Sequence, residues 1–228
     1  DKRKYGFRRA FTLRPHLLKG MLSISGWTMV QSFISVSIWF IFFLAIEHLG
    51  ERPLAVTNIV RNISALLIMV ISAFATTAGA LISNQIGAGE QRCLFKTCGM
   101  TLKLTYAILI PLLIILCLFP ESVLRAFTDS PSLIAASVNS VYVMASSTLI
   151  MAPSFILFNA VSGTGNTRAG FIMEMISLAV YTAVIYYGII RLKPDVALCW
   201  FSEHVYGVTL IFLAWWYLKS GKWRGKKV

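Results

Sequence analysis

The feature that most constrains this chain is a series of six apolar segments, most of them on the order of 20 to 30 residues long and almost free of charge. An α-helix rises about 1.5 Å per residue, so such segments are long enough to cross a hydrocarbon core of about 30 Å. The segments lie at about 17–46, 54–82, 104–119, 132–160, 169–190 and 196–218.

Hydrophobic residues make up 57% of the 228 residues and charged residues only 13%, which is more apolar material than a soluble fold of this size can bury. Backbone groups in lipid must be satisfied within the protein, and the alternating pattern of barrel strands is absent from the sequence. We therefore predict an all-α polytopic membrane protein in which six transmembrane helices form one bundle. The composition argues against a soluble enzyme and a secreted disulfide-rich domain.

The basic residues are distributed unevenly between the connections. The predicted spans divide the 21 Lys and Arg between the two sides of the membrane. Sixteen fall on one side, in the N-terminal arm, the connection between the second and third spans, Arg168 and the C-terminal tail. Five fall on the other side. By the positive-inside rule, both termini are predicted to be cytoplasmic in a multi-pass protein of the cell inner membrane. We expect a basic cytoplasmic linker at 1–15, the transmembrane lobe at 16–219 and a basic tail at 220–228. The membrane explains the net charge of +12, so no nucleic-acid partner is expected.

Residues 91–103 precede the third span and carry Arg92, Lys96 and Lys103 on one helical face. This pattern predicts an amphipathic helix on the cytoplasmic leaflet, and a solvated loop is the alternative.

Polar residues inside the spans recur at helical spacing, and polar faces in lipid turn toward protein or water. We predict that these stripes line a substrate cleft. Small and polar residues also mediate helix packing, which is the alternative for each of them. The cleft candidates are Gln31, Ser35, Asn58, Asn62, Met69, Tyr142 and Ser146.

Two acids, Glu174 and Glu203, lie within predicted spans. Counting residues from the membrane edges separates them by roughly 11 Å in depth, so they are not expected to share one ion. Either is a candidate ion-coupling carboxylate. The alternative is a paired structural acid, with Arg61 as the partner of Glu203.

The sequence offers no set of residues for an enzyme or a resident metal. The four cysteines and three histidines show no metal-ligand spacing, and no nucleophile with a neighbouring base is evident. We expect a protein that is not an enzyme, with no cofactor and no metal site.

Three sequence features resemble one known family. Leu49-Gly50 is followed by Leu54-Ala55 between the first two spans, and the segment AGALISNQIGAG runs from Ala78 to Gly89. The segment SGTGNT at Ser162 to Thr167 is similar to a Gly-x-Gly-Asp-Thr turn, with Asn166 in place of Asp. These features resemble the C-terminal six-helix lobe of multidrug and toxic compound extrusion (MATE) transporters, over nearly the whole chain.

The resemblance implies half of a twelve-helix secondary active exporter that expels organic cations or amphiphilic drugs by alternating access, coupled to Na⁺ or H⁺. It implies a partner N-terminal lobe, membrane lipid around both lobes, and turn glycines at the cytoplasmic side, namely Gly87, Gly89, Gly163 and Gly165. The chain starts at Asp1 within a basic arm, so we expect a fragment of a longer protein. Some MATE exporters carry one acid in the first helix of this lobe and another in the fourth. Here the first span offers Gln31 and the fourth, residues 132–160, has no carboxylate. We therefore expect the essential carboxylate mainly in the other lobe.

Two other functions remain open at this stage. A lipid or oligosaccharide flippase of related architecture would need cationic side chains in the cleft, and Arg61 is nearly alone within the spans. An oligomeric channel or membrane scaffold would function without a partner lobe.

Overall fold

The computed structural model describes residues 15–221 and 223–224, and among these six helices are long and apolar enough to cross a membrane. The basic arm up to residue 14 and positions 222 and 225–228 of the predicted tail lie outside the described residues. The long helices are α1 (Pro15–Glu47), α2 (Glu51–Gly87), α3 (Leu94–Leu118), α5 (Pro131–Gly163), α6 (Thr167–Val184) with its π-helical continuation η3 (Ile185–Arg191), and α8 (Phe201–Ser220). Short helices η2 (Gln91–Cys93), α4 (Pro120–Leu124) and α7 (Val196–Cys199) lie in the connections. The predicted all-α fold class is confirmed.

One expected boundary is absent from the structure. We predicted a separate amphipathic helix at 91–103, but residues from Leu94 to Leu118 form a single helix, α3. The 3₁₀ turn Gln91–Cys93 is the only part of that segment outside α3. Leu94, Thr97 and Cys98 are buried against the bundle, so the apolar side of the segment packs on protein and continues the helix.

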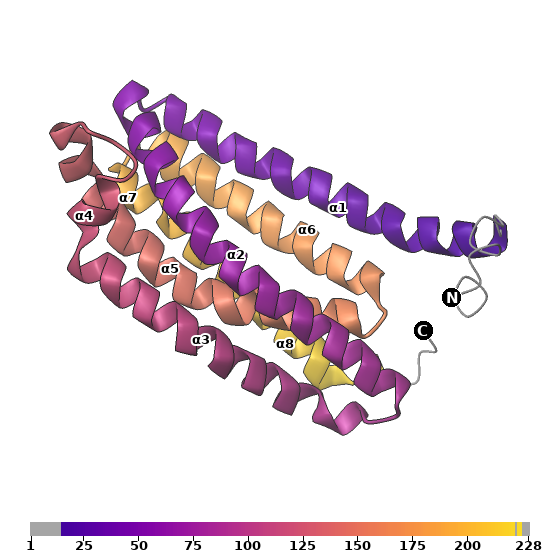
Figure 1. The fold of residues 1–228 in the computed structure, drawn as a ribbon. Helices are drawn as coiled ribbons and strands as arrows, with labels where there is room; N and C mark the ends of the chain where they lie inside the picture. Colours follow the sequence, from indigo (N-terminus) through magenta and orange to yellow (C-terminus); the bar gives the residue numbers. More distant parts are fainter. Residues whose placement is uncertain (1–14, 222, 225–228) are drawn as a thin grey trace, which may run out of the picture.

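Helix α5 lies at the centre of the bundle and α1 lies at its edge (Figure 1). Half of the residues in the most apolar stretch of α5 are buried within the described chain. In the most apolar stretch of α1 only 17% of the residues are buried. Helix α5 contacts α2, α3, α6 and α8, whereas α1 packs mainly along α6 and partly along α2. Much of the surface of α1 is therefore left to lipid or to another part of a larger protein.

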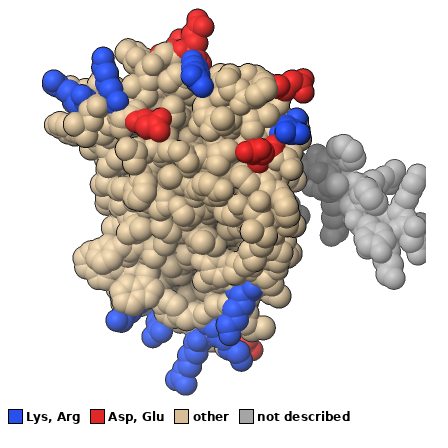
Figure 2. Space-filling view, turned by 90° about the vertical axis from the view of Figure 1, so that its left-hand side faces the viewer, with Lys and Arg blue, Asp and Glu red and all other residues tan. Residues whose placement is uncertain are grey.

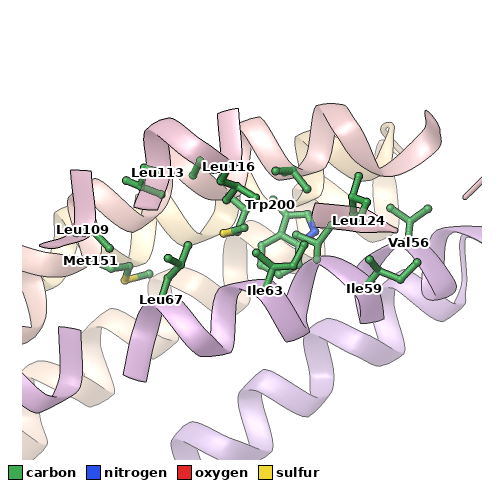
Figure 3. Packing of buried hydrophobic residues seen from close by; sticks show 14 of the residues in the cluster. Val56, Ile59, Ile63, Leu67, Leu109, Leu113, Leu116, Leu124, Met151 and Trp200 are labelled. Atoms are coloured by element: carbon green, nitrogen blue, oxygen red, sulfur yellow. The ribbon is translucent and has the colours of Figure 1, made fainter. Parts of the chain in front are cut away.

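Buried aliphatic side chains from α2, α3 and α5 form the largest apolar cluster (Figure 3). Ile63 and Leu67 of α2 lie opposite Leu109 and Leu113 of α3, and the ring of Trp200 lies inside the cluster, beside Ile63. The i, i+3 and i+4 spacing of these residues places them on one face of each helix.

Charged side chains gather at the two ends of the molecule, with an almost uncharged band between them (Figure 2). The end formed by the α1–α2, α3–α5 and η3–α7 connections mixes both signs. The opposite end, formed by the α2–α3 and α5–α6 connections and the end of α8, is mostly basic. Its described cations include Arg92, Lys96, Lys103, Arg168, Lys219 and Arg224. The uncharged band matches the surface that a membrane requires.

Candidate functional site

A cavity of about 250 Å³ opens between five of the six long helices. Ser35 and Trp39 come from α1, Ile68 from α2, Met151 and Phe155 from α5, Glu174 and Tyr181 from α6, and Glu203 and Tyr206 from α8. Apolar and aromatic side chains form most of its wall. The two acids are the only carboxylates among the described residues that line it.

Glu174 is held by donors from two other helices. Its side chain is 4% exposed. Ser35 Oγ of α1 donates to Glu174 Oε1 at 2.9 Å, and Tyr206 OH of α8 lies 2.9 Å from Oε1 and 3.1 Å from Oε2. Because a buried carboxylate needs hydrogen-bond donors, these contacts fix the position of Glu174 and link α1, α6 and α8.

Glu203 has a similar arrangement on the neighbouring helix. Tyr181 OH of α6 donates to Glu203 Oε1 at 2.8 Å. The rings of Tyr181 and Tyr206 meet edge to face with centroids 5.8 Å apart. Each acid is therefore bonded to a tyrosine of the other acid's helix, and the two tyrosines are in contact.

Both carboxylates line the same cavity. They do so at different levels, because Tyr181, the partner of Glu203, follows Glu174 by seven residues, or about 10 Å along the helix. The expected difference in depth between the two acids stays a prediction.

Arg61 packs on aromatic rings and is not the partner of Glu203 that the sequence suggested. Its guanidinium carbon lies 5.3 Å from the ring centroid of Phe43 and 5.9 Å from that of Trp39. Arg61 lines a second groove, between α1 and α2, together with Asn58.

The structure brings only Ser35 of the predicted cleft residues to the acid cavity. The backbone carbonyl of Gln31 accepts a hydrogen bond from Ser35 Oγ, one turn away from the cavity. Asn62 and Met69 lie on the exposed face of α2, with Met69 73% exposed. Nothing in the described chain covers this face.

Tyr142 and Ser146 lie on another side of α5. Tyr142 OH donates to the carbonyl of Cys117 in α3 at 3.4 Å, and Ser146 Oγ lies 2.9 Å from His204 Nε2 in α8. The polar stripe of α5 thus runs between α3 and α8 and is not part of the acid cavity.

The sequence analysis singled out neither Tyr206 nor Tyr181 as a site residue. Both tyrosines were recognisable from spacing, because Tyr206 follows Glu203 by three residues and Tyr181 follows Glu174 by seven, on the same helical faces. Their partners were not recognisable, because each tyrosine bonds the acid of the other helix.

The four predicted turn glycines have three different roles. Gly89 and Gly165 adopt φ values of +82° and +79°, which favour glycine in a turn. A Cβ on Gly163 would lie 2.5 Å from the carbonyl oxygen of Gly79, so this glycine permits close packing of α5 on α2. Gly87 is the last residue of α2 and has open space around it.

Asn166 anchors the turn after α5. Its Oδ1 accepts from the backbone N–H of Ala169 as the N-cap of α6, and its Nδ2 lies 2.6 Å from Tyr217 OH of α8.

We expect Asn166→Ala to lower the free energy of unfolding by about 1 kcal/mol, because the cap is lost. Asn166→Asp should be nearly neutral, since a carboxylate still caps α6 and can accept from the tyrosine hydroxyl. Thermal unfolding in detergent measures the stability of both variants. Asn139→Ala is the control, because Asn139 is exposed on α5. Equal stability of the Asn166→Ala and Asn166→Asp variants would contradict the prediction.

The family comparison agrees with this architecture. The family model described as MatE matches residues 28–187. The chain belongs to the MatE family. It is thus a multi-pass membrane protein of a transporter family.

Solved transporters share the fold of this MatE chain at low sequence identity. An outward-facing multidrug resistance MATE family transporter of the MOP superfamily has a TM-score of 0.78 at 14% identity, covering 90% of this chain and 46% of its own. A MOP superfamily transporter from Pyrococcus furiosus has a TM-score of 0.76 at 14% identity, and the match covers 87% of this chain and 44% of that transporter. That transporter is described as having a binding pocket of reverse polarity that suggests a different function. A MATE protein in the straight conformation has a TM-score of 0.75 at 14% identity, and the match covers 92% of this chain and 47% of that protein.

The MatE chain therefore spans about half the length of the solved transporters that it resembles. No curated protein matches its sequence.

Proposed function

We propose that this chain is the C-terminal lobe of a secondary active exporter that expels organic cations or amphiphilic drugs by alternating access. The family and the half-length match support a transporter lobe. The observation that carries the proposal furthest is the cavity in which Glu174 and Glu203 are held by tyrosines among apolar walls.

The proposed coupling follows from the chemistry of this cavity. Two carboxylates inside a bilayer are costly when both are ionised and unpaired, so the cavity favours an occupant that brings positive charge. A proton, Na⁺ or an organic cation meets that need, and the aromatic walls suit a lipophilic cation. Occupation by a proton or Na⁺ would weaken binding of the cationic drug, which links the movement of the ion to export of the drug.

We also propose that the mostly basic end faces the cytoplasm of a cell whose inner membrane holds the protein. Its described residues include six Lys and Arg and one acid, Glu90. The positive-inside rule assigns such an end to the cytoplasm, and the end of α8 lies there.

Transport by the full-length protein in proteoliposomes tests the function. We expect a fluorescent organic cation to move against its gradient when a pH gradient or a Na⁺ gradient is imposed separately, and to stop when that gradient is collapsed. Lipid scrambling with no movement of the organic cation under either gradient would favour a flippase. Movement of the cation only down its own gradient would favour a channel.

A further inference from the structure

Glu174 is held by hydroxyl groups. Among the described residues its polar contacts are Ser35 Oγ, at 2.9 Å from Oε1, and Tyr206 OH, at 2.9 Å from Oε1 and 3.1 Å from Oε2. A hydroxyl both donates and accepts, so it donates to an ionised carboxylate and, after rotation, accepts from a protonated one. Guanidinium, ammonium and indole N–H groups can only donate. The contacts of Glu174 therefore suit both the ionised and the protonated carboxyl group.

Ser35 has a second acceptor for its hydrogen. Its Oγ lies 3.0 Å from the carbonyl oxygen of Gln31 and 2.9 Å from Glu174 Oε1, and its single hydrogen satisfies one of them at a time. When Glu174 is ionised, this hydrogen points to the carboxylate. When Glu174 is protonated, the hydrogen can turn to Gln31, and Tyr206 OH is close enough to accept from Oε2. The site can thus take up a proton by rotation of two hydroxyls, without a shift of any helix.

The surroundings of Glu203 favour its ionised form instead. Glu203 accepts from Tyr181 OH at 2.8 Å, and the indole N–H of Trp39 in α1 is a second donor, which cannot reverse its role. Glu203 also lies in the first turn of α8, whereas Glu174 lies in the interior of α6. The N-terminal end of a helix carries partial positive charge, which stabilises a carboxylate. The two acids of the cavity are therefore not equivalent.

The cavity contains no positive side chain of the described residues to offset two negative charges. The ionisable groups that face Glu174 there are Tyr206 and Glu203 from α8 and Tyr181 from its own helix. Helices α1, α2 and α5 contribute only neutral lining residues, namely Ser35, Val36, Trp39, Ile68, Met151 and Phe155. Because uncompensated charge is costly within a bilayer, one acid should be neutral when no cation is bound. The donors around each acid select Glu174 as the neutral one.

Oxygen atoms that could hold Na⁺ are scarce around the cavity. A hard cation binds a shell of oxygen ligands, and in transporters the carbonyls of unwound helices coordinate Na⁺. Here the lining residues of α1, α2, α5 and α6 lie within continuous helices, whose carbonyls bond within the helix. Pro153 leaves the carbonyl of Leu149 in α5 without its helical partner, but this carbonyl accepts from Tyr106 of α3 at 2.8 Å. A proton needs no such shell of ligands.

We propose that Glu174 carries the exchangeable proton of this lobe while Glu203 stays ionised. This inference rests on the proposed exporter function and names the coupling ion at this site. When an organic cation enters the cavity, the proton of Glu174 leaves, and both carboxylates then attract the cation. When the cation leaves, Glu174 takes up a proton again, and Ser35 and Tyr206 reverse their hydrogen bonds. The cavity is thus never left with two uncompensated charges.

Proton release by the full-length protein tests this assignment. Purified protein in weakly buffered detergent is saturated with tetraphenylphosphonium, a lipophilic organic cation, and released protons are measured with a pH-sensitive dye. Glu174→Gln should release about one proton fewer per bound cation than the wild type. Protons carried by the other lobe are released by both proteins, so the difference between the two is decisive. The affinity of the wild type should rise with pH, by up to about tenfold per pH unit for each proton displaced, and more steeply than that of Glu174→Gln.

Infrared difference spectroscopy identifies the acid that holds the proton. The C=O stretching signal of protonated carboxyl groups should decrease when tetraphenylphosphonium binds to the wild type. The part of this signal that belongs to Glu174 should be missing from Glu174→Gln, whereas the full signal should remain in Glu203→Gln at low pH. Glu121→Gln is the control, because Glu121 is an exposed acid on α4, and it should match the wild type in both measurements.

The possible failures of the assignment are distinguishable from failure of the exporter function. Equal proton release by Glu174→Gln and the wild type would overturn the assignment alone, and a wild type that binds no organic cation would overturn both. Replacing K⁺ by Na⁺ at constant ionic strength should affect both proteins equally. A Na⁺ effect that disappears in Glu174→Gln would place Na⁺ at this site and contradict the proposal. If Glu174→Gln does not fold, Glu203→Gln decides, because loss of the carboxyl signal in that variant would assign the proton to Glu203.

Discussion

Replacing both Glu174 and Glu203 by glutamine is expected to lower gradient-driven export of an organic cation by about tenfold or more. Both side chains line one cavity, and no other carboxylate of the described chain lines it. Two unit charges about 5 Å apart attract by roughly 3 kcal/mol at an effective dielectric constant of about 20, so loss of the cavity's negative charge removes most of its affinity for a cation. Glutamine preserves the size of each side chain, so packing changes little.

Initial transport rates in proteoliposomes, at matched protein levels, measure this effect. Glu121→Gln is the control, because Glu121 is an exposed acid on α4 outside the cavity. Tyr206→Phe removes the donor to Glu174 while keeping the ring and should give an intermediate loss. Wild-type rates in the double variant would place coupling in another part of the transporter. Complete loss in Glu174→Gln alone would contradict the expectation that the essential carboxylate lies mainly in the other lobe.

The membrane fold was predictable from the sequence because the dominant energy term is local. A run of apolar residues must be long enough to cross the core, and its backbone must satisfy itself, so length and composition define the spans without knowledge of their neighbours. The continuation of α3 through residues 94–103 was missed, because the apolar face of this segment suits burial against a neighbouring helix as well as burial in lipid. The sequence pattern does not distinguish between these two environments.

The site was predictable only in part, because it depends on how each helix is rotated toward its neighbours. Ser35 and Glu174 stood out as polar residues in apolar helices, and the structure joins them by a hydrogen bond. Tyr142 and Ser146 have the same pattern but face α3 and α8. Small and polar side chains occur at helix contacts throughout a bundle, so a stripe identifies a packed face without identifying its partner.

The contact between Gly79 and Gly163 shows why such packing is hard to read from sequence. Gly163 was predicted from its motif to be a turn residue, yet it is the last residue of α5 and lies against the backbone of α2. Its importance comes from a neighbour more than eighty positions away in the chain.

We expect Gly163→Ala to destabilise the protein by about 1–3 kcal/mol, the usual range for overpacking a close contact. The added Cβ would lie 2.5 Å from the carbonyl oxygen of Gly79, which is backbone and cannot rotate away, so α2 and α5 must separate. For a chain of this size, each kcal/mol corresponds to roughly 2–4 °C in Tm. Thermal unfolding in detergent, followed by size-exclusion chromatography, measures the shift.

Two further glycines make this prediction specific. Gly87→Ala places a Cβ in open space at the end of α2, so its Tm should match that of the wild type. Gly79→Ala brings a Cβ to 2.9 Å from the carbonyl oxygen of Asn159 and should destabilise the same helix pair. Because both substitutions separate the same two helices, the double variant with Gly163→Ala should lose less stability than the sum of the two single losses. Additive losses, or a Gly163→Ala variant as stable as Gly87→Ala, would mean that α2 and α5 are not held together at this crossing.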